Sequence, residues 1–155
     1  MLKRILFILI TGLGITSCIS TKSTIKNIDN TTIKPVIKDD TYQIKEYASD
    51  KKYGYDSDYP INIGFIMEIN EEKFINYYFN ALEGPNGETL TYKKTESCCP
   101  FPTANNKIGG GLLSVYEVTW AGQSKPLKMY FNIFERGKIM CPNGLTIKKS
   151  ILNRP

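Results

Sequence analysis

Histidine is absent from the 155 residues of this chain. Because histidine is the commonest general base near neutral pH and the commonest metal ligand, its absence argues against triad hydrolases and most metal sites. Ser97 and Ser114, for example, have no imidazole to activate them. The sequence therefore predicts no catalytic residue, no metal and no organic cofactor.

The chain also lacks a hydrophobic run that could span a bilayer, which takes about 20 residues. Its one apolar stretch near the start, residues 5–15, follows two basic residues and is much shorter, as in a signal peptide. The Ile-Thr-Ser-Cys sequence at residues 15–18 resembles the lipobox of bacterial lipoproteins. This resemblance implies that residues 1–17 are removed and that Cys18 carries the lipid anchor. Ile rather than Asp at position 19 favours the periplasmic face of the outer membrane.

A large charge of either sign is missing as well. The formal net charge is +5, and loss of the two basic residues of the leader leaves 18 − 15 = +3. A charge this small and scattered does not indicate a nucleic-acid partner. We expect the partners to be the membrane, through Cys18, and an envelope protein or glycan.

Aromatic residues are missing from residues 19–40, which are rich in Ser, Thr, Lys and Asn. Such a composition is typical of a flexible tether. We therefore expect the lipidated cysteine and a tether over residues 18–40, and one folded domain over residues 41–155.

Within the domain, a helix is expected to begin at Asn70, where two glutamates suit the positive helix end. Its apolar face consists of Phe74, Tyr78, Ala81 and Leu82. Residues 90–97, 111–120 and 127–134 then alternate as strands, and a turn containing glycine and proline joins the last two. This order predicts an α+β fold with one amphipathic helix packed on an antiparallel meander of three to five strands.

Several blocks of this domain carry a resemblance. They are residues 53–65, the helix that ends in LEGPNGE, and the segments SCCPF, GLLSVYEVTW and KPLKMYFNIF. Together they resemble a family of small, uncharacterised bacterial lipoproteins. Its members often carry the name 2-dehydro-3-deoxyphosphooctonate aldolase, which implies a sugar-acid enzyme. The enzyme that makes this sugar acid resembles a TIM barrel, which takes ~200 residues or more, and needs cytoplasmic phosphoenolpyruvate, so length and location disagree with that activity.

One loop gathers tyrosines and acids, namely Tyr53, Tyr55, Asp56, Asp58 and Tyr59. Exposed tyrosines suit a ligand or partner, so this loop is a possible binding surface. The alternative is that the tyrosines cover the edge of the sheet. The aspartates lack the distal bidentate glutamate of a calcium loop, which favours a solvated loop over a calcium site.

With Cys18 lipidated, the disulfide candidates are Cys98, Cys99 and Cys141, and disulfides persist in an oxidising compartment. Neighbouring residues of a strand point to opposite faces, which disfavours a Cys98–Cys99 bond. We expect Cys98 to bridge to Cys141 and Cys99 to be left over.

These features predict a lipid-anchored envelope protein that acts as a non-enzymatic binding or structural module. A thiol-redox or thiolate-metal protein that uses the three remaining cysteines is the alternative.

Overall fold

The computed structural model describes residues 23–152; the signal peptide, Cys18 and the first part of the expected tether lie outside the described residues. In chain order the elements are β1 (Ile37–Lys38), β2 (Thr41–Tyr42), β3 (Ile61–Asn62), the 3₁₀ helix η1 (Glu68–Asn70), α2 (Glu71–Phe79), β4 (Leu82–Glu83), β5 (Thr91–Pro102), β6 (Gly110–Thr119), β7 (Leu127–Asn132), β8 (Thr146–Ile147) and α3 (Lys149–Leu152).

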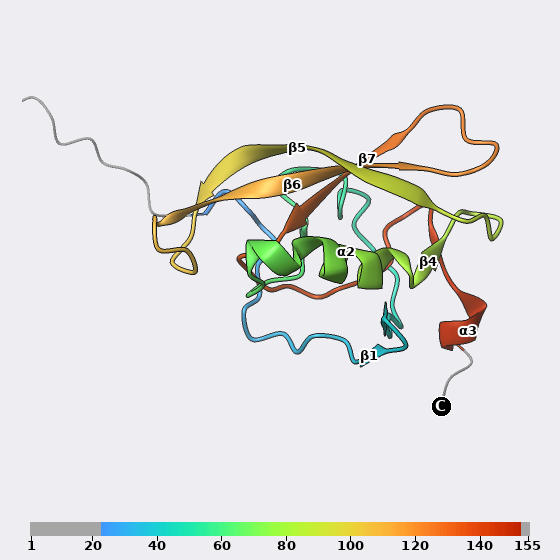
Figure 1. Ribbon diagram of the computed structural model, residues 1–155, viewed down its shortest axis with the longest axis horizontal. Helices are drawn as coiled ribbons and strands as arrows, with labels where there is room; N and C mark the ends of the chain where they lie inside the picture. The colour runs from blue at the N-terminus through green and yellow to red at the C-terminus, as the bar shows by residue number, and fades with distance from the viewer. Residues whose placement is uncertain (1–22, 153–155) are drawn as a thin grey trace, which may run out of the picture.

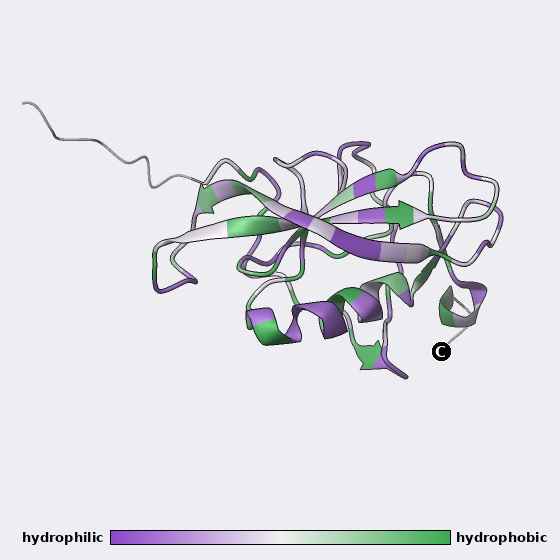
Figure 2. Cartoon of the chain, turned by 45° about the horizontal axis from the view of Figure 1, so that its top comes forward, coloured by the Kyte–Doolittle hydropathy of each residue, from purple (hydrophilic) through white to green (hydrophobic). Residues whose placement is uncertain are grey.

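A four-stranded sheet in the order β3-β7-β6-β5 forms one layer of the molecule (Figure 1). Strands β5, β6 and β7 are antiparallel neighbours, as the alternation of their side chains predicts. The short strand β3 runs parallel to β7, with Ile61 paired to Phe131, so the sheet is mixed rather than a pure meander. Strand β5 is an edge strand, and its middle is hydrophilic (Figure 2). The α+β class is confirmed.

Helix α2 lies between this sheet and the β1–β2 hairpin (Figure 1). On the sheet side, Phe79 stacks on Tyr92 with ring centroids 4.1 Å apart. On the opposite side, the rings of Tyr77 and Tyr42 pack edge to face, with centroids 6.2 Å apart. The helix therefore buries two sides, because it has a neighbour on each.

Three details of the helix differ from the prediction. Asn70 makes no capping hydrogen bond with its side chain, because the 3₁₀ turn η1 leads directly into α2. The helix ends at Phe79, so Leu82 belongs to β4 and not to the helical face. Ile75 is fully buried although the predicted apolar face did not include it.

The segment before β1 packs on the domain, which corrects part of the expected tether. Ile25 is only 6% exposed. The Lys26 backbone N–H donates to the Asp58 carbonyl at 2.8 Å, and the Asn27 amide donates to the Pro60 carbonyl at 2.8 Å. We call residues 25–30 the arm. The polar composition of the arm predicted a tether. The prediction failed because the arm is held largely by hydrogen bonds of its amide groups, which a hydropathy pattern does not reveal.

Candidate functional site

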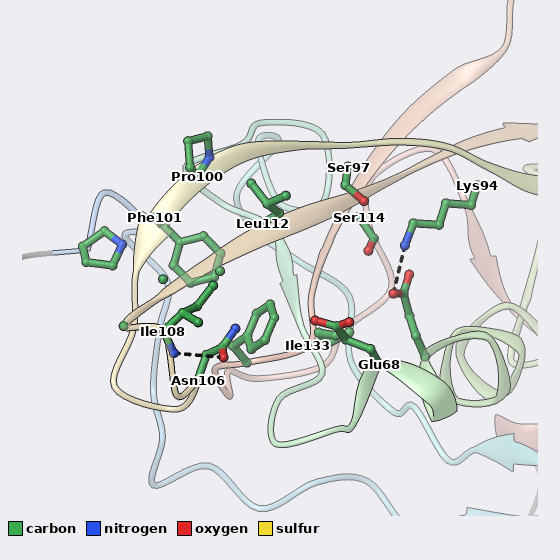
Figure 3. Close-up of a pocket in the computed structure, with 16 residues that line it drawn as sticks. Glu68, Lys94, Ser97, Pro100, Phe101, Asn106, Ile108, Leu112, Ser114 and Ile133 are labelled. Carbon is green, nitrogen blue, oxygen red and sulfur yellow. Dashed lines mark hydrogen bonds and ion pairs between the residues drawn. The ribbon is translucent and has the colours of Figure 1, made fainter.

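A cleft of about 750 Å³ lies beneath the β5–β6 hairpin, next to the start of α2 (Figure 3). Small-molecule sites typically measure about 300–1,000 Å³, so a small organic ligand suits this volume. Side chains from β5, β6, the loop between them, the start of α2 and the segment after β7 form its walls.

One end of the cleft is apolar. The rings of Phe101 and Phe134 meet edge to face with centroids 6.2 Å apart, and Ile108 lines the same end while remaining 85% exposed. Gly111 allows this packing, since a Cβ there would lie 2.7 Å from Phe134 Cδ2 and 2.9 Å from Phe101 Cζ. Any larger residue would therefore force one of the two rings to move.

The other end of the cleft is charged. The Lys94 ammonium lies 3.0 Å from the carboxylate of Glu71, which is nearly buried. The Tyr116 hydroxyl donates to the same carboxylate at 3.2 Å. Burial and the negative charge of Glu71 raise the pKa of Tyr116, which keeps this hydroxyl protonated as a donor. The carboxylate of Glu68 extends into the same end (Figure 3).

A second groove, of about 430 Å³, shares Glu68, Glu71 and Lys94 with the cleft. On its far side the Tyr92 hydroxyl donates to the Asn76 side chain at 3.0 Å. The Lys94–Glu71 ion pair therefore marks the boundary between an apolar cleft and a polar groove along α2 and β5.

Two bulges in β5 decide which side chains reach the cleft. The first inserts Thr95 between the pairs that Lys94 and Glu96 form with β6, and the Thr95 hydroxyl donates to the Val115 carbonyl at 3.2 Å. One extra residue shifts the alternation by one position. Ser97 therefore lines the cleft, on the same side as Lys94.

The second bulge begins directly after Cys98. Cys99 and Pro100 together lie opposite Leu112, and Cys99 has a left-handed φ of 58°. Cys98 and Cys99 form a disulfide, with Cα atoms 3.7 Å apart. The expected Cys98–Cys141 bridge is therefore wrong. Neighbours point to opposite faces only in a regular strand, and the bulge with its left-handed residue removes that regularity.

Cys141 is a free thiol in a different part of the core. It is fully buried, and its backbone pairs with that of Tyr47 in an isolated parallel β-bridge. Cys99, in contrast, packs against a small separate cluster that contains Phe101 and Leu113. Burial raises the pKa of Cys141 to about 12, so its thiol stays protonated and unreactive near neutral pH.

The tyrosines of the possible binding surface have mainly structural contacts. Tyr53 is only 3% exposed, and its hydroxyl donates to the Lys138 carbonyl at 3.0 Å. The Tyr55 hydroxyl donates to the Asn143 carbonyl at 2.6 Å. Tyr53 is therefore a core residue, which corrects its place in an exposed surface.

The acids of this loop are paired with lysines. Asp58 lies 3.0 Å from the Lys26 ammonium, and Asp56 lies 3.9 Å from that of Lys52. Both ammonium groups also lie over the Tyr59 ring, at 5.6 and 5.4 Å from its centroid. The loop and the arm thus stabilise each other.

The residues that line the cleft were missed by sequence reasoning. Glu71 and Lys94 come from different elements, and Phe101, Ile108 and Phe134 come from segments that only the fold brings together. The one local signal was an isolated isoleucine between a lysine and three glycines in a polar loop.

Within residues 23–152, no group of three or more His, Cys, Asp or Glu side chains is placed to hold a metal ion. The helices in this part of the chain are too short or too polar to cross a membrane. No protein-family model, curated protein or solved structure matches the chain.

Proposed function

We propose that the chain is a lipid-anchored binding module of the cell envelope, attached through Cys18, and that its ligand occupies the cleft beneath the β5–β6 hairpin. The observation that supports this proposal is the cleft itself, with one apolar end and one charged end. An amphiphile with an apolar body and an ammonium group matches both ends.

The charge of the ligand follows from the two glutamates. Glu71 is already satisfied by Lys94 and Tyr116, whereas Glu68 forms no ion pair among the residues that the structure describes. Glu68 therefore adds a negative charge to the polar end. An exposed ion pair contributes about 0.2–1 kcal/mol, so the preference for an ammonium head over a carboxylate head should be a few-fold.

The test compares binding of dodecylamine and dodecanoate, below their micelle concentrations, by isothermal titration calorimetry. We expect dodecylamine to bind more tightly. Glu68→Gln should abolish the preference, because it removes the charge, while Glu83→Gln, outside the cleft, should retain it. Equal binding of both probes to the unaltered protein would contradict the proposed ligand class.

A second pair of variants tests the place of binding. Leu112→Glu introduces a charge into the cleft wall at a half-exposed position, and it should weaken both probes at least tenfold. Ile33→Glu makes the same change at a position that is 90% exposed and outside the cleft, and it should have no effect. Similar losses of affinity in both variants would place binding elsewhere.

The lipid anchor has a test of its own. Cys18→Ser should release the protein from the membrane fraction.

The adjacent cysteines favour a second candidate function, thiol–disulfide exchange. A dithiol reductant would break the Cys98–Cys99 bond, leave a proton on each sulfur, and itself become a disulfide. Peptide mapping of thiols alkylated before and after dithiothreitol treatment tests this function. Reversible reduction of the folded protein supports it, and reduction only after unfolding would overturn it.

A further inference from the structure

The arm fixes where the chain enters the domain. Ile25 packs in a small cluster with Phe101 and Leu113, next to the end of the β5–β6 hairpin. The first described residues lie beside the β5–β6 loop in Figure 1. Seven residue steps separate Cys18 from Ile25, and an extended chain of this length reaches at most about 24 Å. A lipid on Cys18 therefore keeps this end of the domain close to the membrane surface.

One buried carboxylate holds the arm and the loop together. Glu135, which is 6% exposed, accepts hydrogen bonds from the Asn30 amide at 2.6 Å and the Asn105 amide at 2.8 Å. The Thr103 hydroxyl donates to its other oxygen. Because Asn30 belongs to the arm and Thr103 and Asn105 belong to the loop, the loop cannot swing away from the anchored arm without breaking these bonds.

The tip of the loop is suited to a membrane interface. Ile108 is 85% exposed and follows the exposed Lys107, while Leu112 is 47% exposed on the adjoining strand. Moving an exposed isoleucine out of water is favourable because it buries apolar surface. A lysine is attracted to an anionic lipid surface. Such contacts are weak in free solution, but an anchored protein makes this contact intramolecularly and at high effective concentration.

We propose that the β5–β6 loop, residues 103–109, is a second and non-covalent membrane contact whose partner is the anionic bilayer that holds the anchor. Ile108 enters the interface and Lys107 contacts the lipid headgroups. This inference rests on the proposed lipid anchor at Cys18. Since Ile108 also lines the cleft, the apolar end of the cleft faces the bilayer, and an amphiphilic ligand can reach it directly from the membrane.

The test uses the full lipidated protein on vesicles of phosphatidylethanolamine and phosphatidylglycerol. A polarity-sensitive fluorophore is attached to Ile108→Cys, and to Ser124→Cys in the turn between β6 and β7 at the opposite end of the molecule (Figure 1). The buried thiol of Cys141 does not compete for the label. We expect a blue-shifted emission and severalfold stronger quenching by lipid-borne quenchers at position 108 than at position 124.

A readout without a label excludes insertion of the dye itself. Trypsin should cleave after Lys107 several times more slowly on vesicles than in detergent, relative to cleavage after the exposed Lys51. Ile108→Asp should restore cleavage after Lys107 on vesicles. If the protein stays on the vesicles but both labels report water and trypsin cleaves after Lys107 as fast as in detergent, the loop contact is overturned and the lipid anchor is not. Protein that does not stay on the vesicles overturns the lipid anchor and the inference together.

Discussion

The Lys94 ammonium lies 3.0 Å from the Glu71 carboxylate, so this ion pair joins the edge strand β5 to the first turn of α2. The Glu71 side chain is only 10% exposed, whereas that of Lys94 is 40% exposed. A carboxylate this buried depends on its partners, because an unpaired charge away from water is costly. The pair therefore stabilises the contact between sheet and helix, and it also separates the two grooves.

Replacing the ammonium tests this role. We expect Lys94→Met to lower the free energy of unfolding by about 1–3 kcal/mol, since only the Tyr116 hydroxyl would remain to satisfy Glu71. Lys93→Met is the control, because Lys93 is 71% exposed and 3.9 Å from Glu117, and such surface pairs contribute little. Urea unfolding measures both variants. Equal changes would show that Glu71 does not depend on Lys94.

Gly111 and its neighbour Gly110 provide a second comparison. Gly111→Ala should destabilise the protein by about 1–3 kcal/mol, since the new methyl group would overlap Phe101 and Phe134. At Gly110 the nearest atom to a new Cβ is the Phe101 carbonyl oxygen, at an ordinary 3.7 Å, so Gly110→Ala should be neutral or slightly stabilising. Thermal unfolding distinguishes the two. A neutral Gly111→Ala would mean that the apolar end of the cleft can open.

Ile25 in the arm can be compared with Ile33, which follows the arm. Ile25→Ala should cost about 2 kcal/mol or more, because it leaves a cavity beside Phe101 and Leu113. Ile33→Ala should change stability by less than about 0.5 kcal/mol, because that side chain is 90% exposed. If both variants unfold like the unaltered protein, the arm is a tether after all.

The main sheet was predictable because its signal is local. Strand β7 follows side-chain alternation, and Met129 and Phe131 are buried where the alternation places them. Strand β6 is buried on both faces over residues 113–116, yet its length and its place before the turn were still read correctly. The parallel pairing of β3 was not predictable, since Ile61 and Asn62 are too short a run to show a period. The buried side of α2 was predicted only in part, because the helix sequence does not show that the β1–β2 hairpin packs on its other side.

The site was much less predictable than the sheet. The bulge at Thr95 shifts the residues between it and the second bulge by one position, and no composition rule marks it. The disulfide between Cys98 and Cys99 depends on a left-handed backbone at Cys99, although a following proline favours an extended conformation. Long-range packing decides both features, so a local reading of the strand predicted the wrong partner for Cys98.

Alkaline pH should destabilise the fold, and the sign follows from its buried groups. Burial raises the pKa of Cys141 to about 12 and also raises the pKa values of Tyr53 and Tyr78. In the unfolded chain the thiol loses its proton near 9.0 and the tyrosines near 10.0. Above these values the unfolded state binds fewer protons than the folded state, so the free energy of unfolding falls as pH rises.

We therefore expect these groups to leave the free energy of unfolding unchanged up to about pH 9. Above that pH the free energy of unfolding should decline, by at most about 1.4 kcal/mol per pH unit for each group. Urea unfolding at a series of pH values measures the decline. Cys141→Ala should delay its onset to about pH 10, where the tyrosines begin to contribute. The slope of stability against pH is the quantity to compare, because the loss of the thiol also changes core packing. An unchanged onset in Cys141→Ala would show that the thiol is not held protonated by burial.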